Sequence, residues 1–305
     1  MTEQKNEEDR KQILLPDGSY MPRLGQGTWQ MAEDDTQRER EIRGLQYGIQ
    51  KGITMIDSAE MYAGGKAEGL AGEAIAGLGE IAGTERSDLY LVSKVLPENA
   101  SKKHMSSSAH RSMKLLGTDY LDLYLLHWRG DADLSEAVWC MEKLREEGKI
   151  RRWGVSNFDV KDMEDLMKVP DGRNCCVNQV LYNLGTRGIE YDLIPWQRER
   201  GIPFMAYSPV GQAGALVTQD GVSKAAMMND RNVKEVAQRR KISVVQLLLA
   251  FVLRLDDFAA IPKAVGLSHI DENAEALNIT LTEEEVEQLS ESFPAPDAKI
   301  AMEKY

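Results

Sequence analysis

Short apolar segments alternate with longer amphipathic segments along nearly the whole chain. The short segments have the character of buried strands, and their ends recur at intervals of roughly thirty residues, about the length of one β-α-β unit. They cover residues 23–27, 53–57, 89–94, 121–127, 152–156, 176–179, 203–208 and 259–263. This alternation predicts a single α/β domain over residues 1–305, a (β/α)8 TIM barrel with an outer ring of helices.

An open, doubly wound sheet is the alternative topology for the same alternation of strands and helices. That fold would place a glycine-rich phosphate-binding turn after its first strand. The segment LGQGTW contains Gly25 and Gly27, but Gln30 stands where the third glycine of a GxGxxG motif should be. The missing glycine favours the barrel.

Helix boundaries are marked in three of the segments between the strands. Ser243 and Thr282 each precede a Gln or Glu by three residues, which is the spacing of a capping box at a helix N-terminus. Gly148 follows a segment with one apolar face and predicts the end of that helix. The apolar face consists of Leu134, Ala137, Val138, Met141 and Leu144.

Four segments lie outside the repeating units. Before the first strand, ILLPDGSYMP predicts a β-hairpin around its PDG turn, which could plug the bottom of the barrel. Residues 1–12 are highly charged, and we expect them to be flexible. Residues 209–232 show little periodicity and predict a loop that covers a cofactor or substrate. Residues 294–305 are expected to form a tail over the same face.

The net charge and the cysteine content limit which classes of partner and which cellular compartment are expected. The formal net charge of −12 argues against nucleic acid as a partner, and more weakly against an anionic membrane. Cys140, Cys175 and Cys176 cannot form a framework of paired disulfides, and the N-terminus has no signal-like segment. Both observations predict a reducing cytoplasm. The longest apolar segment, residues 244–253, is too short to span a bilayer and predicts a buried helix.

Four chemically active side chains close, or shortly follow, three successive predicted strands. They are Asp57, Tyr62, Lys94 and His127. Barrel enzymes carry their chemistry at the carboxyl ends of the strands, so we expect these groups to form one site. Each has a structural alternative: a loop cap, a half-buried aromatic, a surface lysine and a core histidine. Their coincidence at three strand ends favours the shared site.

One reaction uses all four groups, namely proton transfer to a carbonyl oxygen. The ordinary pKa of a phenol is about 10, and a neighbouring Lys94 ammonium would lower the pKa of Tyr62. An ionised Asp57 would hold that ammonium in place. His127 could donate a hydrogen bond to the carbonyl oxygen and orient it. We therefore predict reduction of a carbonyl group.

The ordered motifs of the chain resemble the aldo-keto reductases. The resemblance runs over residues 24–273 and is carried by LGQGTW, ITMIDSAEMY, LVSK, LLHW, GVSNF, VNQ, AYSP and IPKA. It implies a parallel barrel, an N-terminal hairpin and reduction of aldehydes and ketones with NADP(H). VLYN, RGIEYDLIPW and FPAP are most similar to bacterial methylglyoxal-type and related small-aldehyde reductases.

The resemblance also implies roles for individual residues. It makes Asp57, Tyr62, Lys94 and His127 a catalytic tetrad with Tyr62 as the proton donor. Trp29 and Trp128 correspond to walls of the substrate pocket, and Tyr207 to the aromatic that stacks beneath the nicotinamide ring. The residues implied to bind the cofactor are Thr28, Trp29, Ser156, Asn157, Gln179, Tyr207, Ser208, Pro209, Lys263, His269, Glu272 and Asn273.

The chain departs from the family pattern near the expected adenosine 2′-phosphate site. Ala264 stands where many members have serine, and His269 stands where many have arginine. Loss of a planar, permanently charged guanidinium should weaken binding of the phosphate. The resemblance makes NADP(H) the expected cofactor, and the departures at Ala264 and His269 leave use of NAD(H) open as well. Gly69 replaces a frequent glutamate, and nothing in the sequence explains it.

Two other functions are compatible with parts of this pattern. A regulatory subunit that only senses NADP(H) would keep the fold but not need all four catalytic groups. A lyase that forms a Schiff base would use Lys94 as its nucleophile, although Asp57 would keep that amine protonated. The histidines show no HExxH spacing, so we predict no metal site.

Overall fold

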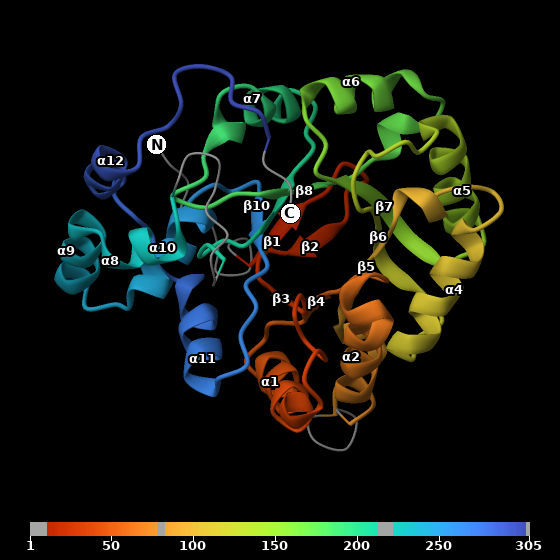
Figure 1. The fold of residues 1–305 in the computed structure, drawn as a ribbon, viewed down its shortest axis with the longest axis horizontal. Helices are drawn as coiled ribbons and strands as arrows, with labels where there is room; N and C mark the ends of the chain where they lie inside the picture. The colour runs from red at the N-terminus through yellow and green to blue at the C-terminus, as the bar shows by residue number, and fades with distance from the viewer. Residues whose placement is uncertain (1–10, 78–82, 213–221, 303–305) are drawn as a thin grey trace.

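The computed structural model describes residues 11–77, 83–212 and 222–302. Eight parallel strands form one sheet in the order β10-β9-β8-β7-β6-β5-β4-β3 (Figure 1). The strands are β3 Gly25–Gly27, β4 Met55–Asp57, β5 Tyr90–Val95, β6 Leu121–Leu126, β7 Ile150–Ser156, β8 Asn178–Leu181, β9 Phe204–Tyr207 and β10 Phe258–Ala260. Each coincides with one of the predicted strands, with ends that differ by three residues or fewer. The barrel prediction is confirmed.

The first and last strands of the sheet meet at a seam. Leu24 pairs with Ala260 in a parallel bridge, and the backbone N–H of Ala260 donates to the carbonyl of Arg23 at 2.9 Å. The guanidinium of Arg23 is buried, and it donates across the seam to the carbonyl groups of Leu253, Leu255 and Phe258. A charged side chain thus satisfies carbonyl groups at the end of α10, in the following turn and in β10.

Helices surround the strands on the outside of the barrel (Figure 1). They are α1 Arg38–Gln50, α2 Lys66–Ala76, α4 Met105–Leu116, α5 Leu134–Glu146, α6 Val160–Lys168, α7 Leu193–Arg198, α8 Lys224–Asn229, α9 Arg231–Arg240, α10 Val244–Leu253, α11 Leu267–Ala276 and α12 Glu283–Ser292. Short 3-10 turns lie at η1 Asp35–Gln37, η2 Tyr62–Gly65, η3 Arg86–Asp88, η4 Pro97–Asn99, η5 Gly172–Asn174 and η6 Gly188–Glu190. Both predicted capping boxes, at Ser243 and Thr282, are present.

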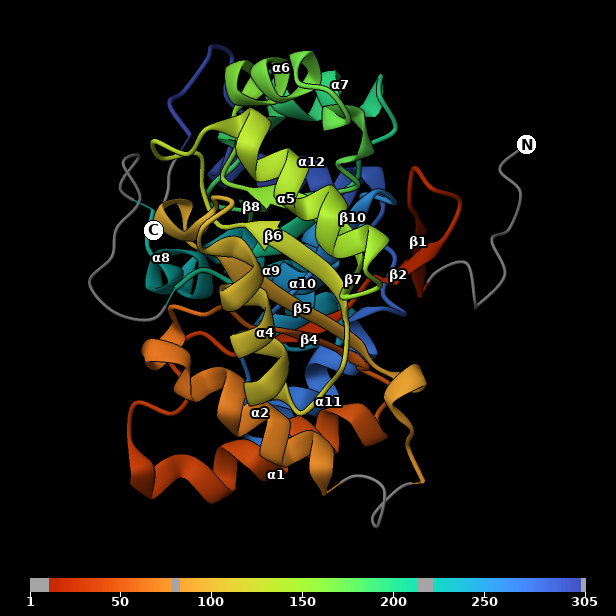
Figure 2. The same ribbon diagram turned by 90° about the vertical axis from the view of Figure 1, so that its right-hand side faces the viewer.

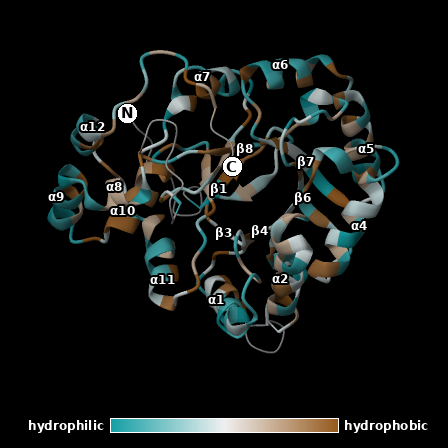
Figure 3. Ribbon diagram, in the orientation of Figure 1, coloured by the Kyte–Doolittle hydropathy of each residue, from teal (hydrophilic) through white to brown (hydrophobic). Residues whose placement is uncertain are grey.

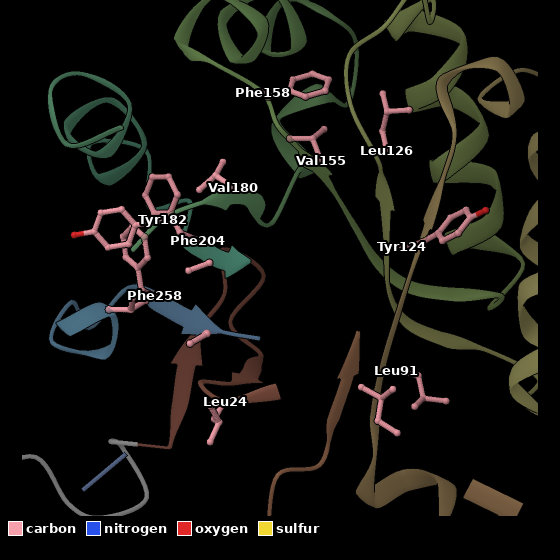
Figure 4. Packing of buried hydrophobic residues seen from close by; sticks show 14 of the residues in the cluster. Leu24, Leu91, Tyr124, Leu126, Val155, Phe158, Val180, Tyr182, Phe204 and Phe258 are labelled. Atoms are coloured by element: carbon pink, nitrogen blue, oxygen red, sulfur yellow. The ribbon is translucent and has the colours of Figure 1, made fainter. Parts of the chain in front are cut away.

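Two layers of apolar packing hold the barrel together. The larger cluster lies between the strands and the helices (Figure 4). In it the ring of Phe258 stacks on that of Phe204 with centroids 4.6 Å apart and lies tilted against that of Tyr182 at 4.9 Å. On the outside of the barrel, α1 and α9 carry mostly hydrophilic residues (Figure 3). Helix α10 is buried along most of its length, as predicted. Of the helices in the described residues, none is long and apolar enough to cross a membrane.

The N-terminal hairpin closes the lower end of the barrel. Strands β1 Gln12–Leu14 and β2 Tyr20–Pro22 pair antiparallel around the predicted PDG turn. Ile13, Leu15 and Met21 are buried in the smaller cluster, together with side chains that fill the barrel interior. In Figure 2 the hairpin and α8 lie on opposite sides of the strands. The hairpin thus acts as the predicted plug.

Two predictions about irregular segments need correction. Gln12 was expected to be flexible but begins β1, and the carbonyl of Lys11 accepts from Arg23 at 2.9 Å. The segment expected to be a loop, residues 209–232, contains helix α8. This helix has only six residues, and the side chain of Ser223 caps its N-terminus. A helix that short carries no clear period. Residues 1–10, 213–221 and 303–305 of the predicted flexible segments lie outside the described residues.

The C-terminal tail crosses the carboxyl end of the barrel. Lys299 pairs with Asp159, which caps α6, at 2.6 Å and with Asp192, which precedes α7, at 2.8 Å. Both acids follow strands whose carboxyl ends carry predicted site residues. The described part of the tail therefore lies over the predicted active face.

Candidate active site

Lys94, in β5, stands at the centre of the predicted catalytic group and is fully buried. Its ammonium donates to the Asp57 carboxylate at 2.6 Å, to the Ser58 carbonyl at 2.8 Å and to the Tyr62 hydroxyl at 3.1 Å. The three N–H donors of the ammonium are thus all used. Because the Tyr62 oxygen accepts from Lys94, the hydrogen of its own hydroxyl is left to donate elsewhere.

Strand register explains why these residues meet. Asp57 in β4 is paired with Val92 in β5, whose side chain fills the barrel interior. Lys94 lies two residues beyond Val92, and side chains two apart in a strand point to the same face. Tyr62 follows in η2, where Ala63 and Gly64 adopt left-handed φ angles of 49° and 66°. That turn begins at Tyr62 and brings its ring back over the ends of the strands.

Burial sets the ionisation of this cluster. Burial raises the pKa of Tyr62 above its ordinary value; the charge of Lys94 acts in the opposite direction and does not prevail. The predicted lowering by Lys94 is thus present, but burial, which the sequence did not reveal, outweighs it. Burial acts to lower the pKa of Lys94, yet attraction to Asp57 and Tyr62 raises it above its ordinary value. The pair is thus an ammonium beside a protonated phenol at neutral pH.

His127 completes the group directly after β6. Its backbone N–H donates to the carbonyl of Val95 at 2.9 Å, and its ring lies 5.7 Å from that of Tyr62. Burial, followed by the nearby Lys94 charge, holds the pKa of His127 well below its ordinary value. Its Nδ1 atom is buried and has no hydrogen-bond partner within the described residues. His127 is therefore a neutral imidazole.

A cavity of about 240 Å³ opens onto these groups. Eleven predicted site residues line it: Lys263 and, with it, Trp29, Asp57, Tyr62, His127, Ser156, Asn157, Gln179, Tyr207, Ser208 and Pro209. Trp128 does not, and its ring instead lies 5.1 Å from that of His127. Thr28 is also absent from the lining and donates to the carbonyl of Asp57 at 3.1 Å.

The residues expected around the nicotinamide form hydrogen bonds to one another. Gln179 donates from Nε2 to the second carboxylate oxygen of Asp57 at 2.8 Å. Tyr207 donates to Asn157 at 2.8 Å, and Asn157 donates to the carbonyl of His127 at 3.2 Å. Asn157 has a φ of 58°, a left-handed conformation that asparagine adopts more readily than most residues. The hydrogen bond between Gln179 and Asp57 was not predicted from the sequence.

A second hollow, of about 300 Å³, lies where the adenosine end was expected. Lys263 and His269 line it, together with Arg40 and Gln37 from the opposite side. Glu41 also borders it, but one of its carboxylate oxygens accepts from the backbone of Ala32 at 2.9 Å. The remaining lining residues are Ala264, Val265 and Gly266. Glu272 and Asn273 of α11 line neither the hollow nor the cavity in the described residues.

Sequence reasoning missed several residues at these two places. Arg40 lies on the hydrophilic face of α1, and a charged helical face gives no signal for a site. Lys224, Gln212 and Met61 line the cavity. Met61 could have been found from its position beside Tyr62. Lys224 could not, because it belongs to the short helix that the pattern did not reveal.

Comparisons with known proteins agree with this site. Residues 23–293 match the model of the aldo/keto reductase family. The chain is 46% identical to methylglyoxal reductase YeaE of Escherichia coli, over 96% of this chain and 99% of that protein. It is 28% identical to the glyoxal reductase of Bacillus subtilis, over 91% of each chain.

A solved structure is similar over nearly the whole length. It is an aldo/keto reductase from Klebsiella pneumoniae, crystallised with NADP and acetate. The TM-score is 0.89 at 46% identity, covering 97% of this chain and 99% of the other. Another crystal structure of an aldo-keto reductase from the same organism, in complex with NADPH, gives the same values. The matches in sequence and in structure both show that this chain belongs to the aldo/keto reductase family.

Proposed function

We propose that the chain reduces small aldehydes with NADPH, and that Tyr62 donates the proton to the carbonyl oxygen. The observation that carries this proposal is the hydrogen bond from Lys94 to the Tyr62 oxygen at 3.1 Å, at the edge of a cavity shared with His127. That bond leaves the phenolic hydrogen free to be donated into the cavity. NADPH, when bound, supplies the hydride for the carbonyl carbon.

Each of the other catalytic groups has a role in this scheme. Lys94 stabilises the phenolate that remains after proton donation, and Asp57 fixes the ammonium through a buried ion pair. Because a neutral imidazole carries one N–H, we place it on Nε2 of His127, so that no buried N–H lacks an acceptor. His127 then donates a hydrogen bond to the carbonyl oxygen and orients it toward Tyr62.

The residues of the two depressions fit an NADP(H) molecule. Tyr207 is half-buried at the cavity and offers a ring face for stacking with the nicotinamide. Ser156, Asn157 and Gln179 supply polar groups for its carboxamide. At the other end, Lys263 and Arg40 offer two cations at the hollow, which suits a 2′-phosphate. Arg40 thereby offsets part of the charge that is lost where His269 replaces arginine.

A small aldehyde is the substrate that this cavity fits best. The cavity is about 240 Å³ and must also accept the nicotinamide, so little space is left beside Tyr62. Trp29 and Met61 give that space an apolar wall. No described residue of the C-terminal tail lines the cavity. Methylglyoxal, on which the Escherichia coli relative is named to act, is a compound of suitable size.

The two alternative functions are less compatible with the site. A Schiff-base lyase needs an unprotonated lysine, whereas the pKa of Lys94 is raised and all three of its N–H groups are bonded. A sensor without catalysis would not need the hydroxyl of Tyr62 to be held at the cavity. Cys140, Cys175 and Cys176 are buried and unpaired, which is in keeping with the proposed cytoplasmic location.

An assay of cofactor oxidation tests the proposal. The purified protein is mixed with NADPH or NADH and with a series of aldehydes from methylglyoxal to benzaldehyde and longer aliphatic chains. We expect oxidation of NADPH to be fastest with the smallest aldehydes. Tight binding of NADPH without oxidation by any aldehyde would support the sensor instead, and trapping of a substrate on Lys94 by borohydride would support the lyase.

A further inference from the structure

The loop of residues 28–32 follows β3 and carries one wall of the cavity. Trp29 and Gln30 of this loop line the cavity, and the ring of Trp29 lies 4.9 Å from that of Tyr62. Trp29 is 40% exposed, so burial alone does not hold its ring in place. The position of the wall beside the phenol therefore depends on how the backbone of the loop is held.

The backbone of this loop is strained at two positions. Gln30 and Ala32 have φ angles of 60° and 61°, in the left-handed region that residues other than glycine seldom adopt. Such conformations persist only where surrounding contacts hold them. At the start of the loop the backbone N–H of Thr28 donates to the carbonyl of Asp57 at 3.0 Å, and in its middle Met31 is fully buried. The strained end of the loop needs a contact of its own.

Glu41 of α1 supplies that contact. Its Oε2 atom accepts from the backbone N–H of Ala32 at 2.9 Å, and both residues are buried. A hydrogen bond from a backbone N–H to a carboxylate is stronger than one between neutral groups. A buried N–H that loses its acceptor is costly, so shortening or removing the Glu41 side chain should release the end of the loop.

Helix α1 holds Glu41 at a fixed place relative to the barrel. The buried face of the helix includes Leu45 and Ile49, and the side-chain amide of Gln26 in β3 donates to the carbonyl of Leu45 at 3.1 Å. Helix and strand are in direct contact here, because a Cβ atom on Gly48 would collide with the Gln26 side chain. The carboxylate is therefore presented to the loop from a rigid element.

We propose that Glu41 is a positioning residue, which holds the strained loop so that Trp29 forms a wall of the aldehyde pocket beside Tyr62. This inference rests on the proposed reductase function. It concerns binding of the aldehyde rather than proton transfer, because the Tyr62 hydroxyl is held separately by Lys94. Glu41 also borders the hollow proposed for the adenosine end, so a direct effect on the cofactor is the competing explanation.

Four variants separate the reach of the side chain from its charge. Glu41→Gln keeps an acceptor oxygen at the same distance but loses the charge, whereas Glu41→Asp keeps the charge but is one carbon shorter. Glu41→Ala removes both. Glu39→Ala is the matched control, since Glu39 is exposed on the same helix and lines neither depression. For each protein kcat and KM for methylglyoxal are measured at saturating NADPH, together with the dissociation constant of NADPH and the hydrogen exchange of the Ala32 amide.

Reach, and not charge, should decide the outcome. We expect KM for methylglyoxal to rise about tenfold in Glu41→Asp and Glu41→Ala, the size expected for loss of one buried hydrogen bond, with kcat and NADPH affinity within about threefold. The Ala32 amide should exchange faster in the same two variants. Glu41→Gln and Glu39→Ala should behave like the unchanged protein. The increase in KM should largely disappear when Trp29 is already replaced by alanine, because the two changes then act on the same wall.

Three results would overturn the assignment. An unchanged KM and unchanged exchange in Glu41→Asp would show that the bond to Ala32 does not hold the loop. A change in NADPH affinity that is alike in Glu41→Gln and Glu41→Ala and absent from Glu41→Asp would make Glu41 a cofactor contact that acts by its charge. Equal losses of kcat in all three Glu41 variants, with lowered melting temperatures, would show a general structural role. If the unchanged protein reduced no aldehyde, the proposed function would fail, whereas the exchange of the Ala32 amide would still test how the loop is held.

Discussion

The proposed catalytic centre and the hollow proposed for the adenosine end are built in opposite ways. At the centre, Lys94, Asp57 and Gln179 are buried, and each is held by a hydrogen bond of 2.8 Å or less. At the hollow, Lys263, Arg40 and His269 are exposed. The bond of Arg40 to Gln37 is long, at 3.5 Å.

This difference predicts how each region responds to substitution. In the buried cluster, removal of one group leaves the others without a partner in a region of low dielectric constant, so effects should be large and not additive. At the hollow, water can replace a lost partner, so effects should be small and roughly additive. We therefore expect the first region to determine whether the enzyme works and the second to tune which cofactor it prefers.

The largest effect is expected for Tyr62→Phe. The change removes only the hydroxyl, so kcat should fall by about 100- to 10,000-fold, the usual contribution of a general acid, while cofactor affinity stays within about twofold. Single-turnover kinetics and cofactor titration would measure the two effects. Tyr20→Phe, at an exposed position of the hairpin, is the matched control. A Tyr62→Phe enzyme with unchanged kcat would remove Tyr62 from the mechanism.

The next largest effect is expected for Asp57→Asn, and it concerns stability. The change leaves the Lys94 ammonium buried without its carboxylate, which should lower the free energy of unfolding by about 3–5 kcal/mol. Urea unfolding would measure it. Asp165→Asn, which disrupts an exposed pair with Lys168 on α6, should hardly change the midpoint. Equal effects of the two changes would contradict the contrast between buried and exposed charges.

A smaller effect is expected for His269→Arg at the hollow. A guanidinium there should tighten NADPH binding by about three- to tenfold and leave NADH binding unchanged, because only NADPH carries the 2′-phosphate. Ser268→Arg adds the same charge at an exposed neighbouring position that does not line the hollow. If both variants bound NADPH and NADH more tightly to the same extent, the gain in affinity would be a general effect of the added positive charge.

The smallest effect is expected from pH. The Tyr62 phenol must be protonated to donate, and its raised pKa keeps it so until well into the alkaline range. His127 must be neutral to act as proposed, and its lowered pKa keeps it neutral into the acid range. The value of kcat for reduction, at saturating cofactor and aldehyde, should therefore be flat between about pH 6 and pH 9. A rise or fall of kcat within that pH range would mean that the pKa of Tyr62 or of His127 lies inside it, which would contradict the prediction.

Sequence reasoning succeeded where a feature is local. The eight strands were evident because each is a short apolar segment bounded by turn residues. The grouping of Asp57, Lys94 and His127 could be predicted because all three lie at or just beyond the carboxyl ends of consecutive strands, and parallel pairing brings such positions together.

Sequence reasoning failed where a feature depends on distant parts of the fold. The bond from Gln179 to Asp57 spans the barrel between β8 and β4, which are not neighbours in the sheet. The pKa of Tyr62 depends on how deeply its ring is buried, which no local pattern reveals. Arg40 and Lys224 come from a hydrophilic helical face and from a six-residue helix, and neither has a sequence signature.

The seam at Arg23 has a consequence for biosynthesis. The carbonyl acceptors of its guanidinium belong to residues 253, 255 and 258, so more than two hundred residues must follow Arg23 before its charge can be satisfied. Strand β3 therefore has no partner at the seam until β10 has been synthesised. Ring closure, and with it the shielding of both edge strands from other chains, must wait for the final quarter of translation.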